Sequence, residues 1–402
     1  MGEAKRQMRA RTLVVHAGER RPAPTGVPAA TPVYATTTFT YDTAREMDEV
    51  FADERRGYVY TRYGNPTVAA LEEAIRLLED GAGACAFSSG MAALHASLLA
   101  CGLAPGATVL ASRDLYGATS ALLRSLFGQL GVETVFADFS ETDALARTVR
   151  RLRPRVLVAE TISNPLLKVS DLEACAQLAH EVGARLLVDN TFATPYLCQP
   201  LAQGADVVVH SATKYLGGHG DVTGGVAVTK TEADCQALSG VSRLAGGILG
   251  VWEAHEILRG LKTLAVRVER QCANAQALAE RLKGHARLSR VFYPTLAQDA
   301  RTQAVVRRTL REPFGGALVT LELREATREA AFRFMDGLRL CVRSTSLGDV
   351  FTGVLHPATA SHREVAPEAR RELGITDGVL RISVGLEDVS DIIADVEQAL
   401  AA

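Results

Sequence analysis

The chain has 402 residues, of which 47% are hydrophobic and 22% are charged, and its formal net charge is −2. This length is sufficient for about two or three domains with a large buried core. The near-neutral charge provides no electrostatic basis for binding nucleic acid or an anionic membrane, so a small anionic ligand has to be held by local groups. No apolar run approaches the roughly 20 residues that a membrane-spanning helix needs. We therefore expect neither a nucleic acid nor a membrane as a partner.

The first residues and the cysteines predict a cytoplasmic protein. The start of the chain is basic but lacks the apolar region of a secretory signal. The seven cysteines are an odd number without a Cys-x-x-Cys pair, which is typical of buried free thiols in a reducing compartment. His356 and His362 do not stand in a metal-binding spacing, and we expect no metal.

The N-terminal segment predicts an extended arm over residues 1–65. Residues 1–57 contain no long periodic run, but they include four prolines between positions 22 and 32 and a threonine-rich stretch. Such an arm can embrace a partner subunit, and the composition is equally compatible with a lid over the same chain. Asn65 and Pro66 then predict a turn and the start of an amphipathic helix.

Strand and helix patterns alternate from residue 84 to residue 229. The apolar runs 84–88, 108–112, 133–138, 155–160, 185–190, 205–211 and 224–229 predict strands, and the segments 90–102, 116–131, 141–153 and 171–183 predict helices. Nearly continuous Val, Leu and Ala strands between helices indicate a mostly parallel sheet that is buried on both faces. We therefore expect an α/β fold, with the large sheet domain over residues 66–255.

A second, smaller domain is predicted for residues 256–402. The segment 251–284 predicts one long helix that links the two domains. Alternating apolar residues then predict strands within 314–324, 338–346 and 378–387, and helices are predicted over 330–338 and 390–402. This mixture is typical of an α+β domain.

Polar residues gather at the carboxyl ends of the predicted strands, where sheets of this kind bind ligands. The clusters are Ser88–Gly90, Ser112–Tyr116, Glu160–Pro165, Asp189–Thr194 and Ser211–Lys214. Because parallel strands end at one edge of the sheet, we expect these five clusters to form a single active site.

Lys214 is the most informative of these residues. It directly follows the apolar run 205–211 and stands among small hydroxyl residues and glycines. An amine that loses contact with water there can shed its proton and form a Schiff base with an aldehyde cofactor. The alternative is a lysine that reaches solvent from the end of a strand.

Three further clusters have both a chemical and a structural interpretation. Ser88, Gly90 and Met91 open a helix after a strand, where backbone N–H groups can bind a phosphate or where the serine only caps the helix. Asp189 can hold a protonated ring nitrogen, as the acid partner of a pyridoxal cofactor does, or it can cap the next turn. Tyr116 can present an aromatic face and a hydroxyl, or it can pack in the core.

The ordered motifs of the chain resemble those of the pyridoxal 5'-phosphate (PLP)-dependent Cys/Met metabolism family. They are YTRYGNPT, FSSGMAA, DLYG, ETISNP, DNTFATP, SATKYLGGHGDVTGG, TSLG and LRISVGLED, and they span nearly the whole chain. The family contains methionine γ-lyase, cystathionine γ-lyase, cystathionine γ-synthase and the O-acylhomoserine sulfhydrylases. The resemblance implies PLP as cofactor, fold type I as in aspartate aminotransferase, an amino-acid substrate, and a homotetramer of two tight dimers.

The resemblance also implies roles for single residues. Lys214 matches the Schiff-base lysine and proton shuttle, Asp189 the partner of the pyridine nitrogen, and Tyr116 the ring-stacking general acid or base. The phosphate-binding positions are matched by Gly90, Met91, Ser211 and Thr213, with Tyr60 and Arg62 reaching across the dimer interface. Asn164, Ser346 and Arg381 match groups near the substrate carboxylate, where an arginine fork is apt.

The same resemblance implies a C–S lyase in which Lys214 removes the α-proton and Tyr116 assists the departure of the γ-substituent. An α,γ-elimination gives 2-oxobutyrate, ammonia and a thiol, whereas addition of an incoming thiol at Cγ makes the enzyme a synthase. A different kind of function, a non-catalytic assembly or regulatory protein of the PLP fold, is expected to lose Lys214, Tyr116 or Arg381, and all three are present.

Two departures from the family pattern bear on the substrate. Cystathionine enzymes carry acids where this chain has Val59 and Thr345, and losing both removes the partners of a distal ammonium group. Ala118 counts against a methionine γ-lyase, because those enzymes typically have Cys at this position, but it leaves the loss of the two acids as the stronger guide to the substrate. We therefore expect a methionine γ-lyase-like enzyme first, a cystathionine γ-lyase or broad C–S lyase second, and a γ-replacement enzyme such as a sulfhydrylase or cystathionine γ-synthase third.

Overall fold

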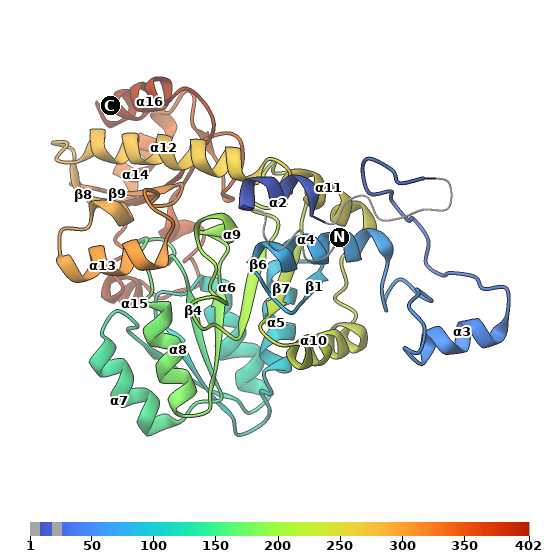
Figure 1. The fold of residues 1–402 in the computed structure, drawn as a ribbon. Helices are drawn as coiled ribbons and strands as arrows, with labels where there is room; N and C mark the ends of the chain where they lie inside the picture. Colours follow the sequence, from blue (N-terminus) through green and yellow to red (C-terminus); the bar gives the residue numbers. More distant parts are fainter. Residues whose placement is uncertain (1–8, 18–25, 402) are drawn as a thin grey trace.

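The computed structural model describes residues 9–17 and 26–401 and contains two sheets (Figure 1). The larger sheet has seven strands in the order β1-β7-β6-β5-β4-β2-β3. These strands are β1 (Gly83–Phe87), β2 (Thr108–Ser112), β3 (Glu133–Ala137), β4 (Val156–Glu160), β5 (Arg185–Asp189), β6 (Val207–Ser211) and β7 (Gly225–Thr229). Strands β3, β2, β4, β5 and β6 are parallel, and β7 is antiparallel to both of its neighbours. The prediction of a mostly parallel α/β sheet is confirmed.

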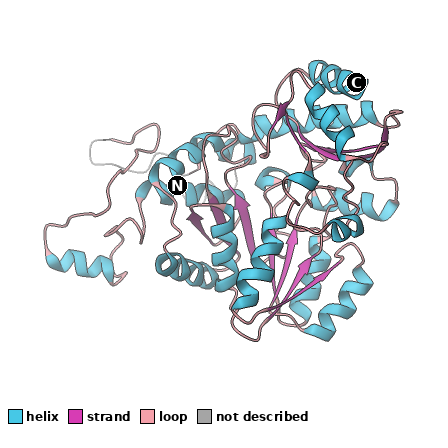
Figure 2. Cartoon of the chain, turned by 180° about the vertical axis from the view of Figure 1, so that it is seen from behind, coloured by secondary structure: helices cyan, strands magenta, loops and turns pink. Residues whose placement is uncertain are grey.

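Helices cover both faces of this sheet (Figure 2). Along β5, Leu186 and Val188 join one buried cluster and Leu187 joins another, so successive side chains enter two separate cores. This arrangement explains why the strands are nearly continuous apolar runs. The helices of this region are α4 (Pro66–Leu78), α5 (Gly90–Ala100), α6 (Gly117–Ala121), α7 (Thr142–Leu152), α8 (Leu172–Glu181), α9 (Thr194–Leu197) and α10 (Glu232–Ala245). The stretch predicted as one helix over 116–131 begins as α6 and continues as a π-helix over Leu122–Phe127.

The second sheet has five strands in the order β10-β11-β12-β9-β8. These are β8 (Leu288–Phe292), β9 (Leu318–Leu323), β10 (Val342–Arg343), β11 (Gly353–Leu355) and β12 (Val379–Ser383), with helices α13 (Ala300–Thr309), α14 (Arg328–Gly337), α15 (Pro367–Glu372) and α16 (Val389–Ala401). Strands β8 and β11 were missing from the prediction. The expected long linking helix is also wrong in detail, because it breaks into α11 (Val251–Leu261) and α12 (Leu264–Leu282).

The N-terminal segment contains two short helices instead of an entirely extended arm. In α2 (Ala10–His16), Leu13 and Val14 are buried, and the helix packs against α4 and α12. Helix α3 (Ala44–Phe51) lies on a segment that projects away from the rest of the molecule in both views (Figures 1 and 2). Part of the expected arm, including Pro22 and Pro24, lies outside the described residues.

All seven cysteines are free thiols, and six of them are buried, as their spacing predicted. Within residues 9–17 and 26–401, no helix is both long and apolar enough to span a membrane.

Candidate active site

A cavity of about 500 Å³ lies at the carboxyl ends of the parallel strands. It is lined from the large sheet domain by Ser89, Gly90, Met91, Leu94, Tyr116, Thr119, Glu160, Ile162, Asn164, Asp189, Thr191, Phe192, Ser211, Thr213, Lys214 and Thr223. The part of the chain beyond α12 adds Thr345, Leu347, Ala360, Ser361 and Arg381. The structure therefore brings at least one residue of each of the five predicted strand-end clusters into one cavity.

Lys214 follows β6 and points its amine at the second domain. Its Nζ donates a hydrogen bond to Ser346 Oγ at 3.1 Å, and among the described residues it has no acidic partner. Burial, and then the positive charge of Arg381, lower the pKa of Lys214 below its usual value. The lysine is thus half-buried beside a positive charge and contacts Ser346, which disfavours the interpretation as a solvent-reaching strand end.

The N-terminus of α5 forms a cradle beside Lys214. Ser89 caps the helix by accepting a hydrogen bond from Ala92 N–H at 3.1 Å. The next residue is Gly90, where a Cβ atom would lie 2.8 Å from Ser211 Cβ and 2.9 Å from Ser211 Cα. Only glycine lets the helix end approach the end of β6 this closely, and the free N–H groups there suit a phosphate.

Asp189 ends β5, and its carboxylate is held by Thr191, two residues later in the chain. Asp189 Oδ1 accepts hydrogen bonds from Thr191 N–H at 2.9 Å and from Thr191 Oγ1 at 2.5 Å, and Thr191 Oγ1 accepts one from Ser211 N–H at 2.8 Å. Burial raises the pKa of Asp189, whereas the Thr191 bonds and the nearby His210 act to lower it. The carboxylate is therefore fixed in place and positioned to hold a cationic group.

Arg381, on β12, provides an unpaired positive charge. It is 2% exposed, donates from Nη1 to Asn164 Oδ1 at 2.9 Å and from Nη2 to the Ser346 carbonyl at 3.3 Å, and its Nε has no hydrogen-bond partner. Among the described residues no carboxylate forms an ion pair with it, and burial lowers its pKa to about 10. A buried guanidinium without a carboxylate is suited to receive one from a ligand.

Tyr116 lines the cavity from the loop before α6, and its side chain is 39% exposed. Its backbone N–H donates to Glu160 Oε1 at 2.6 Å. Glu160, Thr191 and Phe192 are lining residues to which the sequence analysis gave no individual role. The signal that could have found them is their place at the end of β4 or shortly after β5, within the predicted clusters Glu160–Pro165 and Asp189–Thr194.

Five predicted residues lie outside the cavity lining. Ser88 is replaced in the lining by its neighbour Ser89, and its own N–H donates to the Gly247 carbonyl at 3.0 Å. Val59, Tyr60 and Arg62 lie on the N-terminal arm, where the guanidinium of Arg62 donates to the carbonyl of Arg243 at 2.5 Å. Ser346 is not itself in the lining, but it contacts Lys214 and Arg381, which are.

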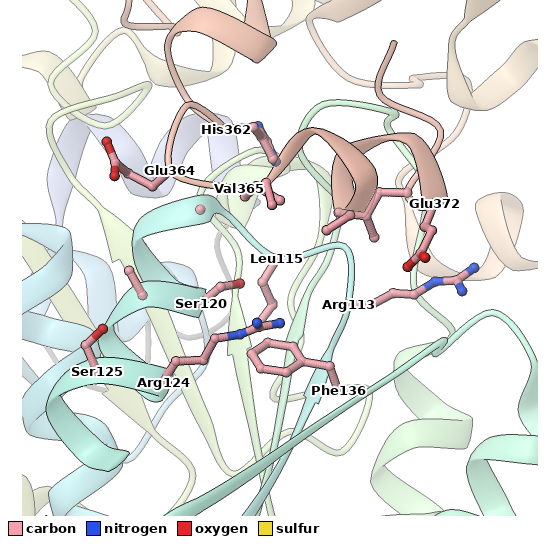
Figure 3. Close-up of a pocket in the computed structure, with 15 residues that line it drawn as sticks. Arg113, Leu115, Ser120, Arg124, Ser125, Phe136, His362, Glu364, Val365 and Glu372 are labelled. Atoms are coloured by element: carbon pink, nitrogen blue, oxygen red, sulfur yellow. The ribbon is translucent and has the colours of Figure 1, made fainter. Parts of the chain in front are cut away.

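A larger cavity of about 650 Å³, shown in Figure 3, lies next to the first one. Gly117 and His362 line it, while their neighbours Tyr116 and Ser361 line the first cavity. At its base the guanidinium of Arg124 stacks 4.3 Å from the ring centre of Phe136. Arg113 and Leu115 of the predicted cluster Ser112–Tyr116 line this larger cavity, but no residue with a predicted individual role does, so size alone does not identify the chemistry.

The residues of the first cavity fit PLP. A reactive lysine, a buried aspartate and a helix-end cradle that a Cβ atom would fill correspond to its aldehyde, ring nitrogen and phosphate. Across the described residues, no group of three or more His, Cys, Asp and Glu side chains is arranged to hold a metal ion.

Three comparisons with known proteins agree with this geometry. The L-methionine γ-lyase of Fusobacterium nucleatum subsp. polymorphum is 43% identical over 373 residues, which are 92% of this chain and 93% of that protein. The cystathionine γ-lyase of Bacillus subtilis is 37% identical and covers 98% of this chain and 99% of its own length. A crystal structure of a putative O-acetylhomoserine (thiol)-lyase from Campylobacter jejuni, which carries a pyridoxyl-lysine monophosphate, matches with a TM-score of 0.92 at 28% identity over 98% of this chain and 100% of that chain.

The architecture and the cofactor are thereby established. A mostly parallel seven-stranded sheet with a smaller second sheet is fold type I, and the expected cofactor, PLP, is confirmed. The family model for Cys/Met metabolism PLP-dependent enzymes matches residues 11–401. The chain therefore belongs to the PLP-dependent enzymes of Cys/Met metabolism.

Proposed function

We propose that the protein is a methionine γ-lyase-like C–S lyase, which converts methionine and water to 2-oxobutyrate, ammonia and methanethiol by α,γ-elimination. The observation that carries this proposal is the charge distribution of the cavity. Its acidic lining residues are Glu160 and Asp189, both at strand ends, and the lining contributed beyond α12 contains no acid. A γ-substituent without charge suits such a wall better than an ammonium group does.

Each proposed role follows from a contact in the cavity. Arg381 binds the α-carboxylate through its guanidinium, whose Nε has no partner in the chain, and its bond to Asn164 fixes the plane of the fork. Lys214 takes the α-proton on Nζ, because burial and Arg381 favour the unprotonated amine. Asp189 holds the protonated ring nitrogen of the cofactor, which when bound acts as the electron sink of the reaction.

The departing thiolate needs a proton, and Tyr116 is the proposed donor. Its hydroxyl belongs to a side chain that lines the cavity but remains 39% exposed, so it has room to face the substrate. Ser346 Oγ, 3.1 Å from Lys214 Nζ, orients the amine between its successive proton transfers.

A panel of substrates tests the reaction. The protein is incubated with methionine, cystathionine, homocysteine and O-acetylhomoserine, with and without an added thiol, and keto acid and thioether are measured. We expect keto acid from methionine without added thiol. Faster release from cystathionine would favour a cystathionine γ-lyase, and thioether formed only when thiol is supplied would overturn the lyase in favour of a γ-replacement enzyme.

We further propose that the active site is completed by a second copy of the chain in a homotetramer of two dimers. In the described lining, the basic residues are Lys214 and Arg381, and neither belongs to the cradle of Gly90 and Ser211. A doubly charged phosphate there calls for a further cation. The segment that carries α3 projects from the molecule (Figure 1), and Tyr60, further along the same arm, is 41% exposed.

A further inference from the structure

The side chain of Glu160 joins two segments that are distant in sequence. Glu160 Oε1 accepts a hydrogen bond from Tyr116 N–H at 2.6 Å, across 44 residues of chain, and the backbone N–H of Asn164 faces the same carboxyl and acts to lower its pKa. Asn164 in turn accepts a hydrogen bond from Arg381, 217 residues further on. One carboxyl group thus connects three residues that we place around the substrate.

Apart from the first turn of α6, where its carbonyl accepts a hydrogen bond from Ser120 N–H at 3.1 Å, the Tyr116 backbone is tied to the sheet through Glu160. Tyr116 is 39% exposed, so the other residues of this chain leave its ring room to move. It precedes α6, a helix of 5 residues, and its side chain makes no capping hydrogen bond. The position of the ring therefore follows the position of the backbone, and Glu160 fixes that backbone.

Glu160 is built into the sheet and not into a surface loop. It is 7% exposed at the end of β4 and stands in register with Asp189 on β5. Burial, and then the charge of Asp189, raise the pKa of Glu160 well above its usual value. Asp189 receives hydrogen bonds from Thr191, so the negative charge of the pair is favoured on Asp189.

We propose that Glu160 is a positioning residue, which fixes Tyr116 and Asn164 relative to each other and, through Asn164, the guanidinium of Arg381. This inference rests on the proposed roles of Tyr116 and Arg381. It predicts that loss of the carboxyl impairs binding of the substrate carboxylate and turnover together, because both groups shift when their common anchor is removed.

The test compares four variants of the PLP-loaded protein. Glu160→Ala removes both acceptor oxygens, and Glu160→Gln keeps one of them in a side chain of the same size. The matched controls are Asp395→Ala and Asp395→Asn. Asp395 is a 6% exposed carboxylate that accepts three backbone N–H bonds, from Arg339, Leu340 and Cys341, outside the cavity.

Binding of glycine, followed by the visible absorption of the cofactor, is the main readout, because glycine has the carboxylate but no γ-substituent. We expect Glu160→Ala to weaken glycine binding by about tenfold and to lower kcat/KM on the sulfur substrate by about 100-fold. Glu160→Gln should retain most of the glycine affinity and most of kcat/KM. A crystal structure of Glu160→Ala should show the Tyr116 loop displaced. The Asp395 variants should lower Tm without changing the affinity for glycine or kcat/KM.

Each outcome decides one question. If Glu160→Ala binds glycine as the unsubstituted protein does and keeps Tyr116 in place, the positioning role is refuted. If the Gln variant loses as much as the Ala variant, the ionisable proton matters and the role is not positional. If the unsubstituted protein binds glycine but releases no keto acid from any sulfur amino acid, the proposed lyase function fails while the glycine comparison still tests Glu160.

Discussion

The amine of Lys214 and the hydroxyl of Ser346, 3.1 Å apart, join the two sheet domains beside the cavity. The contact depends on the turn that follows Ser346. Gly348 has a φ of +77°, and a Cβ atom there would lie 2.7 Å from Tyr215 N. A residue other than glycine would be strained and would push this turn away from Lys214.

The pKa of Lys214 should govern how fast the apoprotein takes up PLP. The positive charge of Arg381 contributes to the lowered pKa, so Arg381→Gln should raise it and should shift the pH midpoint of cofactor uptake to higher pH. Uptake is followed by the visible absorption band, which Lys214→Ala should lack. Arg150→Gln, on the exposed pair with Glu181, serves as the control. An unchanged midpoint in Arg381→Gln would contradict the electrostatic coupling.

Arg381 should recognise the α-carboxylate of the substrate. Arg381→Met should raise KM by roughly 100-fold, because a buried charge-assisted contact is lost. Arg381→Lys should recover only part of the affinity, since a point charge cannot replace the fork that also bonds Asn164. The unsubstituted protein should bind methionine much better than methioninamide. If Arg381→Met kept this preference, the carboxylate would be bound elsewhere.

Asp189 should control the chemistry more than cofactor retention. In Asp189→Asn the Thr191 bonds can be kept, but the ring nitrogen loses its anionic partner. We expect kcat to fall by about 100-fold or more, the typical cost of losing such a preorganised electrostatic contact. The visible band should persist, which separates this variant from Lys214→Ala. Turnover within about threefold of the unsubstituted protein would argue against the assigned role.

The strands and most of the cavity could be predicted because their signals are local. Apolar runs buried on both faces identify β4, β5 and β6, and the polar residue after each strand is visible in the sequence. The link from Glu160 to Tyr116 could not be predicted, because it spans 44 residues and depends on the register of the sheet. The choice between Ser88 and Ser89 could not be predicted either, because the sequence does not show which of two adjacent serines caps the helix.

The errors of the prediction concern short elements. Helix α2 has 7 residues and only Leu13 and Val14 buried, too few for a helical period to appear. Strand β11 has 3 residues. The predicted linking helix 251–284 has an apolar pattern that continues through the break between α11 and α12, so the pattern gives no sign of the turn.

The proposed sharing of the active site predicts complementation between two inactive variants. Arg62→Ala lacks the proposed phosphate ligand that one subunit gives to its partner, and Lys214→Ala lacks the lysine. In a mixed dimer one of the two sites regains both Arg62 and Lys214. Random mixing of equal amounts makes about half of the dimers mixed, so about a quarter of all sites should become active. Arg45→Ala, an exposed residue of the same arm, should stay active alone. Activity no greater than the sum of the separate variants would show that Arg62 does not act in the partner's site.

Acid should destabilise the protein through His362, which is 2% exposed beside the cavity. Burial first, and then the charges of Arg381 and Arg370, lower the pKa of His362 to about 4. Between this value and the ordinary pKa of about 6.5, the unfolded chain binds the proton and the folded chain does not, so stability falls as the pH falls through this window. The full loss below pH 4 amounts to about 3 kcal/mol.

The comparison of Tm at pH 7 and pH 4.5 measures this effect. His362→Gln cannot take up the proton, so its Tm should fall less on acidification than that of the unsubstituted protein, even if its Tm at pH 7 is lower. His285→Gln, at a partly exposed site outside the cavity, should show the same pH response as the unsubstituted protein. An equal fall in Tm for His362→Gln and the unsubstituted protein would mean that other groups carry the acid sensitivity, because a residue that cannot titrate cannot contribute to it.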